Sequence, residues 1–241
     1  MRAETRHQLK QDRFSKVTLE AAEKTVNWSQ EHQGKLIAGA IALAIVAAVA
    51  FGGWYYINSR DQKASLDLDI AVRTLDTPLR PAGTPEQPGY PTFESATQRA
   101  TIARKQLQAV VDTYPGTRSA KMARYFLGLT AAQLGDYATA EHNLQETASS
   151  SNSDLASLGK FALASVYAAE KKDSQAVDLY KQVIDKPTVL VSKVSAQLEL
   201  ASFYESQQKP DEAKKIYQQI QKENPASEAA SLAQQRAAAL K

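Results

Sequence analysis

The side chains best suited to acid–base or metal chemistry are few and scattered along this chain of 241 residues. Cysteine is absent, which excludes disulfides, thiol nucleophiles and thiolate metal sites. Of the three histidines, His7 and His32 lie in the first 35 residues, and His142 stands beside Glu141 on an expected helix. No HExxH, GxSxG or phosphate-loop motif occurs, and no pattern pairs a nucleophile with a base. The sequence therefore predicts a protein that is not an enzyme and that holds no metal or cofactor.

A continuous apolar run, Leu36–Ile57, divides the chain. Its 22 residues include no charge, and as a helix they span roughly 33 Å, enough to cross a hydrocarbon core of about 30 Å. Trp54, Tyr55 and Tyr56 stand near its end, where aromatic side chains favour the membrane interface. We expect a retained transmembrane helix over residues 36–57. The alternative, a cleaved signal peptide, fits less well because 35 residues precede the run.

The charges around this run predict its orientation. Three Lys or Arg residues stand within twenty residues on each side, but the tail, residues 1–35, holds seven of them in a short segment. Short positively charged segments stay in the cytoplasm, whereas long domains are translocated largely regardless of charge. We therefore expect a single-pass membrane protein with a cytoplasmic N-terminus and a large C-terminal part on the other side.

Two helix faces in the first 57 residues are candidate contact surfaces. In the tail, side chains at spacings of three and four predict an amphipathic helix that lies on the membrane or, alternatively, docks a partner. These side chains are Phe14, Val17, Ala21, Thr25 and Trp28. In the apolar run, small residues recur every fourth position and predict a strip where another helix can approach closely. The strip consists of Ala40, Ala44, Ala48 and Gly52.

The remainder, residues 58–241, has the length of one domain and a nearly balanced charge, without a basic stripe for nucleic acid. A helix is expected from Arg60 to Leu75. Five prolines then predict an irregular loop over residues 77–92. From Phe93 onwards helix-forming residues dominate and no strand pattern occurs, so the predicted fold class is all-α.

An internal repeat organises this helical part. The segment Leu163–Tyr167 recurs as Leu200–Tyr204, and Ala140 recurs as Ala176 and Ala213, at offsets of 36 and 37 residues. Each unit reads as a helix, a short polar turn and a second helix. The predicted units cover residues 121–152, 157–187 and 194–225, followed by a capping helix over 226–241.

The repeat resembles the tetratricopeptide repeat. Small residues of the first helix, Gly128, Ala164 and Ala201, stand where that family packs its helices closely, and Pro225 closes the third unit. The resemblance implies an α-solenoid with a peptide-binding groove on the first helices. The predicted fold is therefore a single N-terminal transmembrane helix followed by this solenoid. By this resemblance the groove residues are Met122, Tyr125, Leu129, Leu158, Phe161, Ser165, Ser195, Leu198 and Ser202. None of them supplies the Lys and Asn of a carboxylate clamp, so that mode of binding is not expected.

The order of parts and the segment Gly53–Ser59, GWYYINS, resemble the ancillary subunit family of the bacterial SecYEG translocon. The resemblance implies a scaffold or chaperone-like subunit of the inner membrane. Its periplasmic repeat domain would bind translocon subunits, a membrane-anchored folding factor and emerging clients, but no small molecule. The segment Tyr114–Tyr125 also resembles repeat proteins of envelope assembly. The alternative is therefore a structural or assembly factor of the cell envelope or division machinery, recruited through its span and tail.

Overall fold

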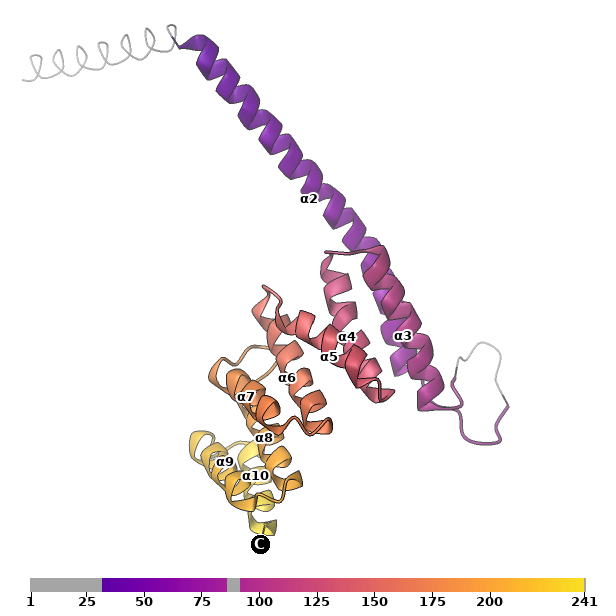
Figure 1. Cartoon of the computed structure of the whole chain (residues 1–241), viewed down its shortest axis with the longest axis vertical. Coiled ribbons are helices and arrows are strands. Elements are labelled where there is room, and N and C mark those ends of the chain that lie inside the picture. Colours follow the sequence, from indigo (N-terminus) through magenta and orange to yellow (C-terminus); the bar gives the residue numbers. More distant parts are fainter. Residues whose placement is uncertain (1–31, 86–91, 241) are drawn as a thin grey trace, which may run out of the picture. The chain divides into compact units, whose positions relative to one another are not determined.

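The computed structural model describes residues 32–85 and 92–240, and within these ranges the only β geometry is an isolated bridge between Leu79 and Phe93. The described helices are α2 (Gln33–Asp76), α3 (Ala96–Thr113), α4 (Arg118–Gln133), α5 (Tyr137–Ala148), α6 (Ser153–Ala169), α7 (Asp173–Asp185), α8 (Lys193–Ser206), α9 (Pro210–Glu223) and α10 (Glu228–Ala239) (Figure 1). The predicted all-α class is confirmed. The amphipathic helix predicted from Phe14 to Trp28 lies outside the described residues.

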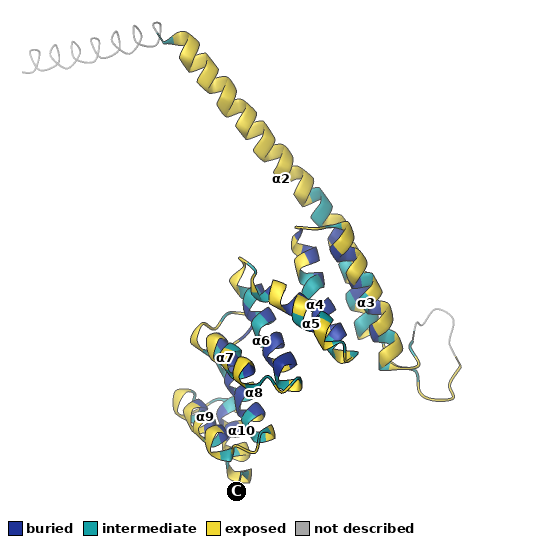
Figure 2. Ribbon diagram, in the orientation of Figure 1, coloured by how far each residue is buried: buried dark blue, intermediate teal, exposed yellow. Residues whose placement is uncertain are grey.

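Helix α2 contains the whole apolar run and continues beyond it, over 44 residues. The mean hydropathy of its most apolar stretch is 2.4, and that stretch is entirely unburied (Figure 2). By length and composition α2 is therefore able to cross a membrane. The chain divides into two compact units, Met1–Ile57 and Asn58–Lys241.

In the second unit, each helix from α3 to α10 packs on the next helix along the chain, and α4 also contacts α6 (Figure 1). Such neighbour-on-neighbour packing divides the core into clusters rather than one centre. One cluster joins Leu144 of α5, Tyr167 of α6 and Tyr180 of α7. Another joins Ala71 of α2 to Leu107 of α3. The predicted solenoid of helical hairpins is thus the observed architecture.

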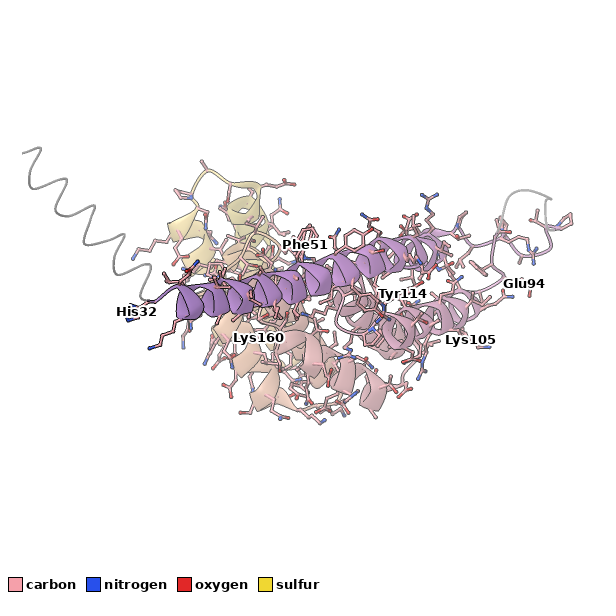
Figure 3. The ribbon with its side chains drawn as sticks, turned by 90° about the horizontal axis from the view of Figure 1, so that it is seen from above. His32, Phe51, Glu94, Lys105, Tyr114 and Lys160 are labelled. Atoms are coloured by element: carbon pink, nitrogen blue, oxygen red, sulfur yellow. The ribbon has the colours of Figure 1, made fainter. Side chains whose placement is uncertain are left out.

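The part of α2 after Ile57 belongs to this packing. Ala64 and Ala71 are fully buried, and their small side chains allow close helix contacts. Tyr114, which lies just after α3 and is labelled in Figure 3, donates a hydrogen bond of 2.8 Å to the Asp67 carboxylate of α2. The segment 58–76 of α2 therefore acts as the first helix of the folded domain.

Three tight turns between paired helices have the same backbone conformation. Gly135, Lys171 and Gln208 have φ angles of 76°, 59° and 57°, in the left-handed region. In each turn, the N–H of the residue that follows the left-handed one donates a hydrogen bond to the carbonyl oxygen five positions before it in the chain. These three hydrogen bonds measure 2.9, 2.8 and 2.9 Å. This bond satisfies a carbonyl at the end of the first helix. The turns separate α4 from α5, α6 from α7 and α8 from α9.

Side-chain caps begin most helices of the second unit. The Asp136 carboxylate accepts from Thr139 N–H at 3.1 Å at the start of α5, and Thr117 does the same for Ala120 N–H in α4. Such caps satisfy orphan N–H groups of the first turn. The other capping residues are Ser95, Asn152, Ser192 and Ser227.

The proline-rich segment after α2 is joined at its two ends. Arg80 N–H donates to Phe93 O at 2.7 Å, Phe93 N–H donates to Pro78 O at 3.3 Å, and the Arg80 and Glu94 side chains form an ion pair of 2.6 Å. Residues 86–91 of the loop predicted over 77–92 lie outside the described ranges. The loop is consequently an insertion that leaves and rejoins the helical domain at one place.

Candidate protein-binding surface

The nine predicted groove residues lie on α4, α6 and α8, the first helices of the three predicted units. Helix α4 carries Met122, Tyr125 and Leu129, helix α6 carries Leu158, Phe161 and Ser165, and helix α8 carries Ser195, Leu198 and Ser202. None of the nine is fully buried. The fold therefore leaves all of these side chains at least partly open to solvent.

Four larger side chains in this set also contribute to the core. Tyr125 and Phe161 pack against the cluster of α5, α6 and α7, and Leu198 packs against the cluster of α8, α9 and α10. Leu158 packs against a smaller cluster that contains Val183 and Val191. The rings of Phe161 and Tyr180 meet edge to face, with their centroids 5.9 Å apart. These residues hold neighbouring hairpins together and leave only part of their surface available to a partner.

Other members of the set are freer. Leu129 is 36% exposed and belongs to no core cluster. Ser165 is exposed, and its Oγ lies 3.1 Å from the Tyr180 hydroxyl, whose pKa is raised by burial. Ser202 is exposed as well. Leu129 and Ser202 are therefore the positions where a substitution changes the surface with the least effect on packing.

The structure adds a feature that sequence reasoning missed. A hollow with two lobes of about 360 and 410 Å³ lies among the first turns of α4, the end of α5, the start of α6 and the loop before α8. Of the nine predicted residues only Met122 lines either lobe. Arg118 and Lys121 line it too, and their positive charges on one face of α4 were the available indication in the sequence.

Charged clusters of the described domain have structural roles. Lys172 Nζ donates to the Glu141 carboxylate at 2.6 Å, and the Tyr167 hydroxyl donates to the same group at 3.2 Å. The hydrogen bond from Lys172, more than any other contact, holds the pKa of Glu141 below its usual value. His142 is exposed on α5, and no group of three potential metal ligands occurs in the described parts of the chain.

The predicted strip on the apolar run lies entirely on the exposed surface of α2. Ala40, Ala44, Ala48 and Gly52 are all exposed. A Cβ added at Gly52 would meet no atom within 4 Å. The strip is thus available to a second helix, and within the described residues no helix occupies it.

The comparisons with known proteins agree with this fold. A family model described as a tetratricopeptide repeat-like domain matches residues 27–241. No curated protein matches the sequence.

Two crystal structures are similar: the nearly identical TPR-like repeats of a proposed kinesin light chain of Podosopora anserina, and a single-residue variant of them. Each structure is 17% identical to this chain in sequence, with a TM-score of 0.55. Each match covers 74% of this chain, and it covers 84% of the variant's chain and 85% of the other crystallised chain. At this identity the likeness concerns the fold alone. Because the family model spans most of the sequence, the chain belongs to the tetratricopeptide repeat-like domain family.

Proposed function

We propose that this protein is a membrane-anchored scaffold that binds partner polypeptides on the first helices of its repeats. Tetratricopeptide-like folds are generally non-catalytic scaffolds for protein interactions. The observation that carries the proposal is the open surface of α4, α6 and α8, where the first helix of each predicted unit presents partly exposed side chains. Solenoids use extended surfaces of this kind to bind peptide segments.

The apolar part of α2 is the proposed anchor. A single span would hold the repeat domain close to the membrane and raise its effective concentration for partners there. We place the N-terminus in the cytoplasm and the repeat domain in the periplasm, on the charge of residues 1–35. The resemblance of Gly53–Ser59 supports the more specific proposal of an ancillary subunit near the SecYEG translocon, acting on emerging clients.

The topology is tested with introduced cysteines, because the natural chain has none to interfere. Ser15→Cys places a thiol in the tail, and Ser174→Cys places one at an exposed position of α7. A thiol reagent that cannot cross the inner membrane, added to cells whose outer membrane has been permeabilised, should label only Ser174→Cys. Labelling of Ser15→Cys instead would overturn the proposed orientation.

The binding surface is tested by placing charge on it. We expect Leu129→Lys and Ser202→Lys to reduce the recovery of partners that co-purify with the full-length protein from membranes. Ser174→Lys on α7 is the matched control and should leave recovery unchanged. Circular dichroism should show the same helix content for all three variants. An unchanged partner set with Leu129→Lys and Ser202→Lys would show that partners bind elsewhere.

The identity of the partners is tested by photocrosslinking in cells from position 129. Because Leu129 is exposed and packs on no core cluster, a photoreactive residue there should leave the fold intact. Crosslinks to translocon subunits, a membrane-anchored folding factor or secreted clients would support the translocon assignment. Crosslinks that include none of these would refute it and leave the general scaffold proposal standing.

A second candidate function, a structural or assembly factor of the cell envelope or division machinery, rests on the exposed strip from Ala40 to Gly52. In that case the span itself would recruit the partners through close helix contacts. Partners should then survive deletion of residues 93–241 but not replacement of Leu36–Ile57 by an unrelated apolar span. The scaffold proposal requires the opposite results: partners should be lost on deletion of residues 93–241 and retained when Leu36–Ile57 is replaced.

A further inference from the structure

The hollow between the starts of α4 and α6 shares only Met122 with the predicted groove. Its lobes of about 360 and 410 Å³ adjoin, since Lys121, Ser151 and Leu155 line both. Volumes of this size accommodate several side chains of a peptide or a small ligand. Figure 1 shows the three helices that border it, α4, α5 and α6, which also contact one another.

Two cations on the rim of this hollow have no partner among residues 32–85 and 92–240. Arg118, the first residue of α4, and Lys121, one turn later, are exposed, and neither side chain forms an ion pair or hydrogen bond there. Arg124 differs, because it is paired with Glu146. The lining of the two lobes contains three cations, which are Arg118, Lys121 and Arg124, and two anions, which are Glu146 and Asp154. It therefore has one cation more than anions. The rim can therefore accept a carboxylate without first breaking an existing ion pair.

The rest of the lining offers apolar surface. Leu155 at the start of α6 is 7% exposed and Met122 is half-buried, whereas Leu190 in the loop between α7 and α8 is 53% exposed. The neighbour of Leu190, Val191, is buried, and its N–H donates to Thr188 Oγ1 at 3.2 Å. This anchoring holds Leu190 at the edge of the hollow, where it can cover an apolar side chain of a ligand.

We propose that this hollow docks an acidic, leucine-bearing segment of a partner polypeptide. A carboxylate of the segment would bind Arg118 and Lys121, and an apolar side chain would lie against Met122, Leu155 and Leu190. A nucleic acid fits less well, because it needs a stripe of cations and offers no aliphatic side chain. The proposal rests on the function proposed above, that the domain binds polypeptides, and adds a second subsite with its own chemistry.

The test uses the full-length protein in lipid nanodiscs and short fluorescein-labelled peptides, read by fluorescence anisotropy. One peptide carries paired glutamate and leucine residues, the second replaces glutamate by glutamine, and the third replaces leucine by serine. We expect the first to bind about tenfold or more tightly than either of the others. We also expect its affinity to fall as salt is added, because exposed charges are screened.

The decisive variant is Arg118→Glu with Lys121→Glu. Neither side chain packs in a core cluster, and acidic residues are favourable in the first turn of a helix, so the variant should fold. It should lower the affinity for the first peptide about tenfold or more. The double variant Met122→Ser with Leu190→Ser should lower that affinity by a similar factor. Lys105→Glu on α3, labelled in Figure 3, reverses a single positive charge outside the hollow and should have no effect.

Three results would overturn the proposal. The first is equal binding of the first peptide by the charge-reversed variant. The second is equal binding of all three peptides by the natural protein. The third is complete competition by citrate at concentrations similar to the peptide, which would indicate a site for a small organic anion. Leu129→Lys separates the two proposals, because it should reduce partner recovery on the open surface and leave binding of the peptide in the hollow intact.

Discussion

Gly159 is the position where the addition of one methyl group should cost the most stability. It lies on α6 and faces the end of α5, where an added Cβ would stand 2.4 Å from Ala148 N and 2.8 Å from Thr147 C. Both atoms are backbone, so no rotamer change can relieve the contact. Ordinary van der Waals contact begins near 3.4 Å, so the two helices would have to separate by about 1 Å. Gly159→Ala therefore tests how closely the fold requires α5 and α6 to approach.

The expected loss follows from two opposing effects. Alanine favours a helix over glycine by about 1 kcal/mol. Overpacking costs typically 1–3 kcal/mol, and the contact with rigid backbone favours the upper end of that range. The net change is a loss of about 2 kcal/mol in the free energy of unfolding. For a domain of this size that corresponds to a decrease of roughly 4–8 °C in Tm.

Gly128→Ala is the matched comparison. Its added Cβ would lie 2.6 Å from Leu144 Cγ and 2.9 Å from Leu144 Cδ2, which are side-chain atoms that can move. The gain in helix propensity should then offset most of the strain, leaving a loss of about 0–1 kcal/mol. Thermal and urea unfolding of the full-length protein in detergent, followed by circular dichroism, measures both. Equal stability of Gly159→Ala and the natural protein, or a larger loss with Gly128→Ala, would refute the reasoning.

Three further predictions concern the turns and caps of the repeats, and the same unfolding measurements check them. Lys171→Gly and Gln208→Gly should each stabilise the domain by about 1 kcal/mol, because both residues adopt a left-handed φ that favours glycine, as at Gly135. Unchanged or lower midpoints of thermal and urea unfolding would contradict this. Lys209→Asp should add about 0.5–1 kcal/mol, since its backbone angles resemble those of the capping residue Asp136 and α9 has no side-chain cap; Lys214→Asp, inside the same helix, is the control and should not stabilise. Asp136→Ala should cost about 1 kcal/mol through loss of the α5 cap. Hydrogen bonds from Thr139, and then from Arg104, hold the pKa of Asp136 below its ordinary value of 3.8. The stabilisation is therefore complete above about pH 4 and is lost as pH falls below it, so the natural protein and Asp136→Ala should converge in acid.

Much of the architecture could be predicted because it depends on local patterns. The apolar run needs only its length and the absence of charge to indicate a spanning helix. The repeat offsets of 36 and 37 residues placed small residues such as Ala140 and Ala176 in the core, where both are fully buried. The hairpin turns were marked by short polar segments, although nothing in the types of Lys171 and Gln208 indicated their left-handed backbone.

The candidate surfaces depended on information that the sequence does not contain. The spacing of Tyr125 and Phe161 predicts a groove-facing position, but only their contacts with neighbouring helices reveal that both also pack against the core. The hollow brings Lys121 together with Leu155 and Leu190, which are 34 and 69 residues further along the chain. Such a site arises from the stacking of three successive hairpins, and no local pattern encodes it.

The helical class, the apolar run and the repeat could all be read from the sequence, because each depends on the order of residue types along one segment. Which residues remain exposed depends on how the helices pack. Met122, Leu129 and Ser202 are accessible because of the way each hairpin packs on the next, and Gly159 is required because two backbones meet there. Burial depends on neighbours distant in the chain, so the proposed binding surface can be recognised only when those neighbours are in place.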